Sequence, residues 1–538
     1  MDILIKNAKI IDGCGNPWFR AEIGISDGKI SKIASKINAD AKKIIDAKEM
    51  IVCPGFIDVH SHTDFIFPFY SRADSFVQQG ITTCVVGMCG QGLAPIHPNR
   101  VDEFRKSMGE IVPVFKEIDI KWNTFSEYIK EMVKRRTPIN LIFFVGFEAI
   151  RVSAGPAFDN RPPTEEEIKK MRASLAEAME SGAFGMSTGL IYAPQIFAST
   201  EEITEVAKEL KTYGGLYFTH IRDEGGDVLE AIKEAIAIVE NSGCKGGQIA
   251  HHKIAGRKYW GLSKETLKLI SEANQRGISI YCDSYPYIRS MTTLKTGLPP
   301  WAREGNDEKI LERLRDPKQR TKIIESVKTE HERWENLIHD DGFEHIFISS
   351  VNSQKWKPYI GDSIAEATKK SGRENVWDTF FDLLIDDNLG IHVTIEDMGE
   401  GDIKRILSSR YQMVGTDGAA IPANPGLGAY HPRFFGTYPR ILRKYVREEK
   451  VITIENAIRK MTSFPAQRLG LTDRGVIKEG MCADIVIFDS EKITDKATFI
   501  NPHQFPEGIS HVIVNGVVVV KNQKQFRKTP GKILRPHT

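Results

Sequence analysis

The stretch from Ile51 to Asp64, Ile-Val-Cys-Pro-Gly-Phe-Ile-Asp-Val-His-Ser-His-Thr-Asp, decides how the rest of the chain is interpreted. It predicts a Pro-Gly turn, a short apolar strand and then two histidines separated by one residue. Because alternate side chains of a strand point to the same side, His60 and His62 project together if the strand continues through them. Two converging imidazoles at a strand end suit a divalent metal ion, whereas the alternative is a pair of surface histidines in a loop.

Seven more strand-like segments follow this first one, and helical patterns lie between several of them. The helical segment at residues 164–181 begins with a threonine cap and three glutamates, which are favourable at a helix start. Strands that alternate with helices predict an α/β chain, folded as a (β/α)8 TIM-like barrel over residues 54–464. The expected strands are residues 56–59, 82–86, 140–145, 183–186, 215–219, 247–250, 278–281 and 411–415, and the other expected helices are 200–213, 227–242 and 263–276.

The last two expected strands lie roughly 130 residues apart, which is far longer than a loop. We therefore predict an insertion over residues 288–400, after strand seven, and its pattern indicates mostly helices. An insertion at this point would hang over the active-site face of a barrel. A lid is one interpretation, and an element that serves packing or oligomer formation is the other.

The two ends of the chain both read as β structure. The N-terminal end has a hairpin pattern with an Asp-Gly turn at residues 27–28, and the C-terminal end has one with an Asn-Gly turn at residues 515–516. Neither end is large enough to build a good core alone. We predict one β-sandwich domain made from residues 1–53 and 465–538, with the barrel inserted in it.

The bulk composition indicates a globular chain of two or three domains, with 538 residues, 41% hydrophobic residues and a net charge of +2. This charge balance favours neither nucleic acid nor an anionic membrane as the partner. The chain has no apolar run long enough to span a membrane, and its start does not resemble a signal peptide, so a cytoplasmic location is expected. The seven cysteines are scattered without a Cys-x-x-Cys pair, which argues against a disulfide framework.

Metal-capable side chains follow the expected strands at corresponding positions. In a barrel of this kind, catalytic residues lie at the carboxyl ends of the strands, and thiolate, imidazole and carboxylate are all good ligands of Zn²⁺. A carboxylate beside bound zinc could take a proton from water and pass it to a leaving nitrogen. Asp417 is the only acid among these strand-end residues; the alternatives are a metal ligand or a turn residue before Gly418. The strand-end residues are His60, His62, Cys89, His220, His251 and Asp417.

Several motifs make the chain resemble a known family. The segment Pro-Gly-Phe-Ile-Asp-Val-His-Ser-His at residues 54–62 resembles the amidohydrolase superfamily. Within it, the chain is similar to the D-aminoacylase, or N-acyl-D-amino-acid deacylase, family over essentially its whole length. That closer resemblance is carried by residues 182–194, 219–224, 251–253, 283–287, 415–418, 431–433, 477–486 and 514–516.

The resemblance implies a role for each matching position. It implies a tight zinc held by Cys89, His220 and His251, and a second, often weak or empty, metal position at His60 and His62. It implies that Asp417 acts first as general base and then as general acid. The substrate carboxylate would be held by Arg433, Lys253, Tyr285 and Ser290. The neighbouring His252 leaves open which of two adjacent histidines faces the site.

The resemblance implies zinc-dependent hydrolysis of N-acyl-D-amino acids to a carboxylate and a free D-amino acid. The alternatives are a cyclic amidohydrolase of the hydantoinase or dihydroorotase type, an enzyme of the isoaspartyl-dipeptidase type, and a catalytically silent oligomeric scaffold. Hydantoinases and dihydroorotases usually bridge two metals with a carboxylated lysine after strand four, and residues 183–190 contain no lysine. The side chain, the acyl group, the number of metals and a homo-oligomeric state are left open.

Overall fold

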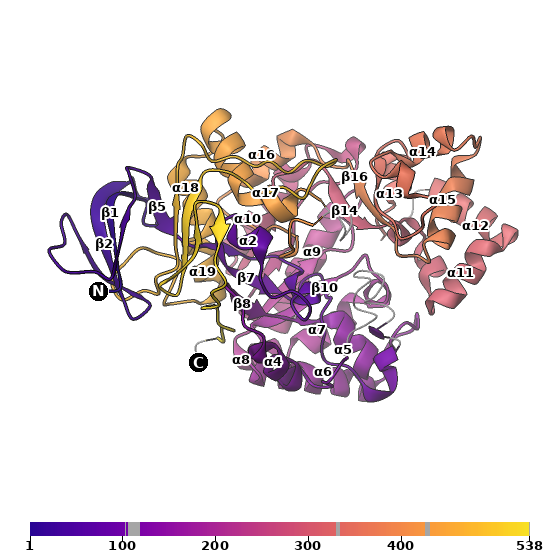
Figure 1. The fold of residues 1–538 in the computed structure, drawn as a ribbon. Helices are drawn as coiled ribbons and strands as arrows, with labels where there is room; N and C mark the ends of the chain where they lie inside the picture. The colour runs from indigo at the N-terminus through magenta and orange to yellow at the C-terminus, as the bar shows by residue number, and fades with distance from the viewer. Residues whose placement is uncertain (103, 106–118, 330–333, 425–430, 537–538) are drawn as a thin grey trace.

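The computed structural model of the chain describes residues 1–102, 104–105, 119–329, 334–424 and 431–536. The expected α/β class is confirmed, because parallel strands alternate with helices through the middle of the chain. In Figure 1 the first strands lie at one end of the molecule, and helices from the second half of the chain lie at the other.

The two ends of the chain share one sheet of nine strands, in the order β21-β20-β19-β18-β5-β1-β2-β3, with β4 beside β1. Strand β18 pairs antiparallel with β5, which joins the C-terminal strands to the N-terminal ones. Apolar side chains from both ends, such as Ile5, Ile23 and Ile485, are fully buried in one cluster. The strands are β1 (Ile3–Ile10), β2 (Phe19–Ser26), β3 (Lys29–Ala34), β4 (Lys43–Asp46), β5 (Ile51–Pro54), β18 (Ile485–Phe488), β19 (Ile509–Val514), β20 (Val517–Lys521) and β21 (Lys524–Gln525).

The strands of the middle region are parallel and form two hydrogen-bonded sets, β6-β7-β8 and β17-β13-β12-β11-β10-β9. The segments that follow β6 and β17 are hydrogen-bonded to each other, because His62 N donates to Gly418 O at 2.7 Å and Asp417 N donates to His60 O at 2.8 Å. The strands are β6 (Phe56–Asp58), β7 (Ile81–Val86), β8 (Asn140–Phe143), β9 (Val145–Gly146), β10 (Gly185–Gly189), β11 (Leu216–His220), β12 (Gly246–Ile249), β13 (Ile280–Ser284) and β17 (Gln412–Val414).

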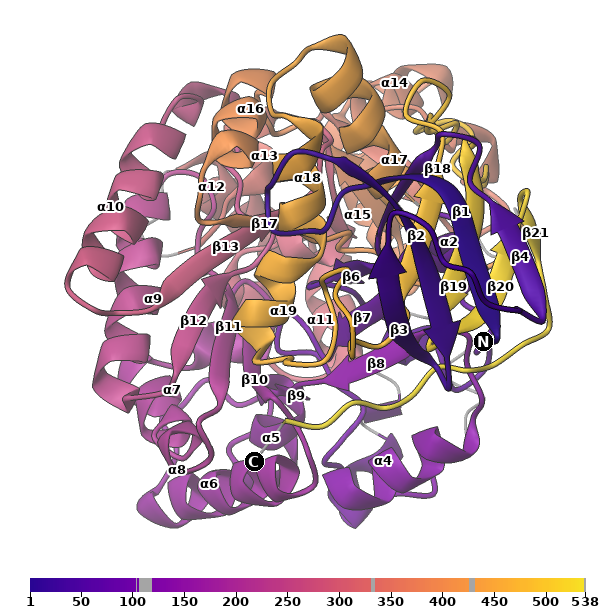
Figure 2. The ribbon, with the colours of Figure 1, turned by 90° about the vertical axis from the view of Figure 1, so that its left-hand side faces the viewer.

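Helices lie outside these strands, as Figure 2 shows for α6 to α10 beside β10 to β13. Helix α6 starts where the sequence predicts, since Thr164 and Glu167 form a reciprocal capping box. No helix within the described ranges is long and apolar enough to cross a membrane. The helices are α1 (Thr63–Ile66), α2 (Asp74–Val77), α4 (Phe125–Lys134), α5 (Phe147–Ala154), α6 (Glu165–Glu180), α7 (Thr200–Ala207), α8 (Leu210–Tyr213), α9 (Val228–Ser242), α10 (Ser263–Gln275), α16 (Glu400–Ser408), α17 (Arg433–Arg440), α18 (Ile454–Met461) and α19 (Ser463–Leu469).

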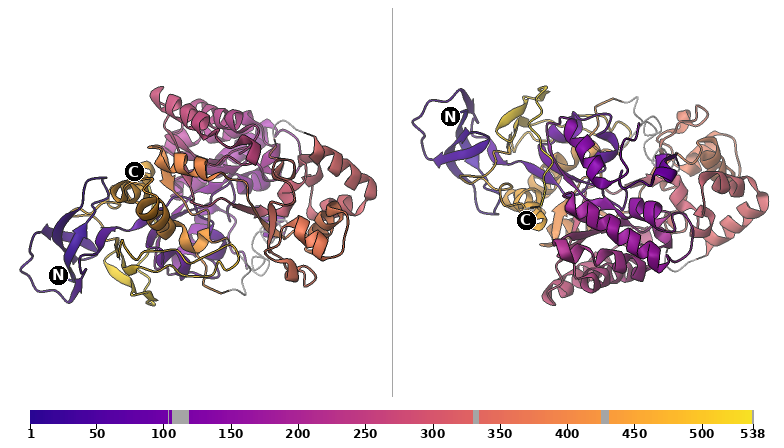
Figure 3. Two further views of the ribbon diagram at one scale, coloured as in Figure 1. Left: turned by 90° about the horizontal axis from the view of Figure 1, so that it is seen from above. Right: turned by 90° about the horizontal axis from the view of Figure 1, so that it is seen from below.

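The segment between β13 and α16 builds its own hydrophobic cluster, which includes Leu314, Ile323 and Phe380. Figure 3 shows it at the opposite end of the molecule from the terminal strands. Besides the expected helices it contains an antiparallel sheet, β14-β16-β15, that the sequence analysis missed. Its elements are α11 (Asp307–Arg315), α12 (Pro317–Lys328), α13 (Leu337–Asp341), α14 (Ile364–Lys370), α15 (Val376–Asp386), β14 (Ser290–Thr293), β15 (Ile346–Ser350) and β16 (His392–Ile395).

Candidate active site

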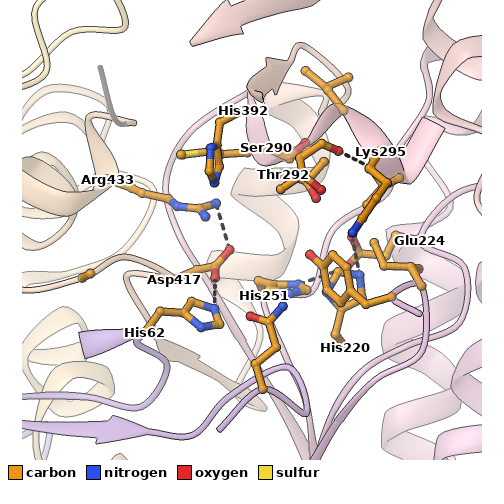
Figure 4. A pocket seen from close by; sticks show the side chains of 18 of the residues that line it. His62, His220, Glu224, His251, Ser290, Thr292, Lys295, His392, Asp417 and Arg433 are labelled. Atoms are coloured by element: carbon orange, nitrogen blue, oxygen red, sulfur yellow. Dashed lines mark hydrogen bonds and ion pairs between the residues drawn. The ribbon is translucent and has the colours of Figure 1, made fainter. Parts of the chain in front are cut away.

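The predicted metal-capable residues converge where the parallel strands end, and Figure 4 shows several of them around one pocket. His220 is the last residue of β11, and the others follow β6, β7, β12 and β17 within a few residues. Because these strands are parallel, their carboxyl ends meet on one side. We call this group the strand-end cluster; it consists of His60, His62, Cys89, His220, His251 and Asp417.

Three members of the strand-end cluster have an unusual backbone conformation. Cys89, His251 and Asp417 have φ angles of 54°, 33° and 48°, in the left-handed region that residues other than glycine rarely adopt. Such conformations cost of order 1–3 kcal/mol each and gather at functional sites, where the surrounding structure enforces them. The chain turns sharply after each of these strands, and the turns direct the three side chains toward one another.

The ligand atoms of the cluster lie close together. Cys89 Sγ is 3.4 Å from His60 Nε2 and 3.4 Å from His251 Nε2. Asp417 Oδ1 is 3.3 Å from His60 Nε2 and 3.1 Å from His62 Nε2. One ligand atom from each of His60, Cys89, His251 and Asp417 lies within 4.8 Å of the others, and His220, Glu224 and His251 form a second such group.

The charges around the cluster favour the ionised forms of Cys89 and Asp417. Burial would raise the pKa of the Cys89 thiol, but His60 and His251 hold it well below its usual value. Burial would likewise raise the pKa of Asp417, but Arg433 and His251 hold it well below the usual carboxyl value. A thiolate and a carboxylate are therefore available beside imidazole nitrogens, which is the form in which these side chains bind metal.

The cluster fits a zinc ion. Both ring nitrogens of His220 are buried and have no hydrogen-bond partner among the described residues. A buried polar atom of this kind normally has a partner, and a metal ion provides one. Sulfur, nitrogen and oxygen ligands in one small space match the preferences of Zn²⁺. Of the two adjacent histidines, His251 is the one that faces the site, with its Nε2 beside Cys89. His252 points elsewhere, and its Nε2 lies 3.0 Å from Thr266 Oγ1.

Two buried aspartates, Asp283 and Asp58, form hydrogen bonds and close contacts with residues of the cluster or next to it. Asp283 Oδ1 lies 3.3 Å from His60 Nδ1 and accepts a hydrogen bond from His251 N at 2.9 Å. Asp58 accepts from Thr416 N at 2.9 Å and from its hydroxyl at 2.6 Å. A carboxylate beside the second nitrogen of a metal ligand orients the imidazole and increases its basicity, and Asp283 is so placed toward His60.

Glu224 is a member of the site whose role the sequence analysis did not identify. Its Oε1 lies 3.0 Å from His251 Nδ1, and both of its oxygens accept from Lys253 Nζ, at 2.7 and 2.6 Å. Burial would raise the pKa of Glu224, but Lys253 and His220 lower it. A signal was available, because Glu224 follows His220 by four residues within a motif already singled out.

The four residues expected to hold a substrate carboxylate all line the pocket. Arg433 Nη1 lies 2.8 Å from Asp417 Oδ2, and its guanidinium lies 4.8 Å from the Tyr285 ring. The Tyr285 hydroxyl is buried without a hydrogen-bond partner among the described residues. Lys253 is paired with Glu224, and Ser290 Oγ donates to Asp397 Oδ2 at 2.6 Å.

The pocket itself has a volume of about 170 Å³ and is walled by two parts of the chain. The strand-end cluster lies on one side. The insertion contributes the other side, which we call the insertion wall: Thr292, Lys295, Arg303, Glu335 and His392. No motif in the sequence marked these five residues, because the elements that carry them meet only in the folded chain.

Comparison with known proteins gives a consistent result. A model of the Amidohydrolase family matches residues 43–275 and 379–520. An N-acyl-D-aspartate deacylase of Alcaligenes xylosoxydans xylosoxydans is 32% identical, over 99% of this chain and 95% of its own length.

Two solved structures are similar across nearly the whole chain. The crystal structure of an N-acyl-D-glutamate deacylase from Bordetella bronchiseptica, complexed with zinc and a phosphonate mimic of the tetrahedral intermediate, superimposes with a TM-score of 0.82. It is 30% identical, and 99% of each chain is covered. A D-aminoacylase with a binuclear metal centre, described as activated by one metal and attenuated by a second, has a TM-score of 0.80. It is 29% identical, again with 99% of each chain covered.

Proposed function

The chain belongs to the amidohydrolase family, and from this premise we propose that it hydrolyses N-acyl-D-amino acids to a carboxylate and a free D-amino acid with the help of bound zinc. The observation that carries the proposal is the position of Cys89, whose sulfur lies 3.4 Å from a histidine of each of two metal-capable groups. The basic and phenolic groups of Arg433 and Tyr285 stand in the same pocket, where they suit an amino-acid carboxylate.

We further propose that the parallel strands close into a (β/α)8 barrel. The hydrogen bonds between the His60–His62 segment and Asp417–Gly418 support closure, because these segments directly follow the first and the last of the parallel strands. The corresponding division is a barrel over residues 54–464, an insertion over 288–400, and a β-sandwich domain from residues 1–53 and 465–538. The separate hydrophobic clusters of the ends and of the insertion support this division.

Cys89, His220 and His251 are the proposed ligands of one tight zinc ion. His60 and His62 are the proposed ligands of a second, weaker position, and the binuclear centre of the similar D-aminoacylase supports this arrangement. Bound zinc would supply Lewis acidity, which polarises an amide carbonyl and lowers the pKa of water from about 15.7 towards 7.

Asp417 is the proposed carrier of protons. Within the strand-end cluster its carboxylate lies beside His60 and His62, and the pKa of this carboxyl group is held well below its usual value. As a general base it takes a proton from the attacking water, and as a general acid it then gives that proton to the leaving amide nitrogen. One carboxylate therefore serves both halves of the hydrolysis.

Arg433 and Tyr285 are the proposed main contacts of the substrate α-carboxylate. The guanidinium offers a planar pair of donors, and the Tyr285 hydroxyl is buried with no partner of its own among the described residues. Lys253 and Ser290 complete the proposed set. Arg433, Lys253 and Ser290 each have a carboxylate partner in the structure, so the Tyr285 hydroxyl is the member of the set whose donor is left for the substrate.

The experiment that tests the proposal is the turnover of paired N-acetyl-D- and N-acetyl-L-amino acids by purified, zinc-loaded protein, read as release of free amine. We expect release from the D series, and its loss after zinc is removed with a chelator. A hydantoin and dihydroorotate serve as the comparison substrates. Turnover of these cyclic amides without turnover of any N-acyl-D-amino acid would overturn the proposal.

A further inference from the structure

Asp397 is a buried acid next to the pocket for which the proposed reaction has no use. It follows β16 and is only 1% exposed. The antiparallel pairing of β14 with β16 sets Ser290 opposite Ile395 and so brings Ser290 close to Asp397. Trp260 Nε1 donates to Asp397 O at 2.8 Å, which fixes the backbone at this point. The sheet of the insertion thus pairs a serine that lines the pocket with a carboxyl group behind it.

Asp397 and Ser290 are joined by two hydrogen bonds of different kinds. Ser290 N donates to Asp397 Oδ1 at 3.2 Å, and Ser290 Oγ lies 2.6 Å from Asp397 Oδ2. An ionised carboxylate can only accept, so it takes the hydroxyl proton of the serine. A protonated carboxyl group has one accepting oxygen and one O–H donor, and these match the backbone N–H and the hydroxyl oxygen of Ser290. The positions of the oxygens therefore suit both protonation states of Asp397.

The direction of the hydroxyl hydrogen bond decides what Ser290 offers to the pocket. A serine hydroxyl has one proton and two lone pairs. When Asp397 is ionised, that proton points to Asp397, and only lone pairs are left for a substrate carboxylate. When Asp397 is protonated, it donates to Ser290 Oγ, and the serine proton is free to point to the substrate. A carboxylate therefore binds better to the pair in its protonated state.

The surroundings of Asp397 favour its protonated form. Burial raises the pKa of Asp397 to about 7, and Glu224 adds to this rise, whereas the hydrogen bond from Ser290 and the charge of Lys253 act against it. A substrate carboxylate that arrives beside Ser290 brings another negative charge, which raises the pKa of Asp397 further. The other titratable or charged groups around the pair are Glu335, Asp341, Tyr285 and the mutually paired Arg289 and Glu396.

We propose that Asp397 is a positioning residue that is protonated when substrate binds, donating to Ser290 Oγ so that the Ser290 hydroxyl turns its proton to the substrate α-carboxylate. This inference rests on the proposed function, because it concerns how the same site holds its substrate. Where free Asp397 is ionised, substrate binding takes up one proton from solvent. The affinity for substrate therefore falls as the pH rises through the pKa of Asp397.

Asp397→Asn is the sharpest test, because the amide permanently has the donor and acceptor of the protonated acid. KM for the fastest substrate of the N-acetyl-D-amino acid panel is measured with zinc-loaded protein from about pH 6 to about pH 8, on either side of that pKa. At the lower pH we expect similar KM values for wild type and variant. At the higher pH the wild-type KM should be about 10-fold above that of the variant, because the protonated fraction of free Asp397 falls. kcat should differ by no more than a few-fold throughout.

Asp402→Asn is the matched control. Asp402 also accepts a hydrogen bond from a serine, Ser263, but neither residue is among the described residues that line the pocket. This variant should keep the wild-type pH dependence of KM.

Ser290→Ala supplies a second test. In this background Asp397→Asn should change KM little at any pH, because the hydroxyl that Asp397 orients is gone. If Asp397→Asn does not fold, the ratio of KM for Ser290→Ala to KM for the wild type carries the test. This ratio should fall as the pH rises, because the wild type loses the contribution of the hydroxyl when Asp397 ionises.

The outcomes separate the two proposals. If the ratio of KM between wild type and Asp397→Asn stays constant over this pH range, or if the variant has much the higher KM at the lower pH, Asp397 does not have the proposed role, while the deacylase function stands. A constant ratio between Ser290→Ala and wild type leads to the same conclusion. No amine release from any N-acetyl-D-amino acid would overturn the deacylase function and the inference together.

Discussion

The strand-end cluster and the insertion wall face the same pocket, but they are built in different ways. In the strand-end cluster, charged groups compensate one another over short distances, as in the 2.8 Å contact between Arg433 and Asp417. In the insertion wall, Arg303 is buried and has no carboxylate within ion-pair distance among the described residues. Charged side chains at the strand ends are thus held by one another, whereas the Arg303 guanidinium is held by a hydrogen bond to the backbone oxygen of Ile191.

The two sides also differ in how they are attached to the fold. Members of the strand-end cluster follow parallel strands directly, and three of them have backbone angles that only a tightly determined turn maintains. The insertion wall is carried by a unit with its own hydrophobic cluster. We therefore expect changes in the first region to remove catalysis or zinc, and changes in the second to alter selectivity or local stability.

The largest effect is expected from Asp417→Asn. The amide cannot take a proton from water, so kcat should fall by about 1,000-fold. Zinc content, measured by metal analysis, should stay close to that of the wild type. Nearly full activity in this variant would contradict the proton-transfer role, and a parallel loss of zinc would assign Asp417 to metal binding instead.

Cys89→Ser tests the metal site directly. Since a serine hydroxyl is a much poorer zinc ligand than a thiolate, most of the tightly bound zinc should be lost together with the activity. Cys282→Ala is the matched control, because Cys282 is also fully buried but lies within β13, outside the strand-end cluster. Equal zinc content in both variants would show that Cys89 is not a ligand.

Glu224→Gln should have a smaller effect, because Glu224 acts through His251. Loss of the carboxylate that orients this ring should weaken zinc binding by about 10- to 100-fold, measured by competition with a chelator. Glu234 lies on α9 and forms a partly buried ion pair with Arg222. Glu234→Gln breaks this pair, serves as the control and should leave zinc affinity unchanged. Equal zinc affinities in wild type and Glu224→Gln would remove the positioning role.

The smallest effect on turnover is expected from Phe380→Ala, in the core of the insertion. Phe380 is fully buried, so its loss should destabilise the protein by about 3 to 5 kcal/mol in chemical denaturation. Zinc content should not change, because the strand-end cluster lies outside this hydrophobic cluster. Ile360→Ala, at a position that is 40% exposed in the same insertion, should cost far less. Loss of zinc in the Phe380 variant would show that the two regions are not separable.

Much of the fold was predictable because its signals are local. Each parallel strand of the middle region overlaps a segment predicted as a strand, and the Thr164 cap marked the start of α6. The sheet of the insertion was not predictable in this way. Strand β14 has the sequence Ser-Met-Thr-Thr, which is not a typical strand composition. It pairs with β16 about 100 residues later, so the segments next to it in the chain do not indicate the pairing either.

For this protein, the sequence by itself determined which metal-capable residues meet, because they follow strands whose carboxyl ends lie on one side of a parallel sheet. The reaction was implied by the family resemblance of the motifs that carry these residues. The sequence left open which of two adjacent histidines faces the site, and only the tertiary structure decided this. His251 and His252 are adjacent in sequence, and the positive φ of His251 directs one to Cys89 and the other to Thr266. The burial of Arg303 in the pocket was decided in the same way, since it depends on how a separately packed insertion meets the strand ends.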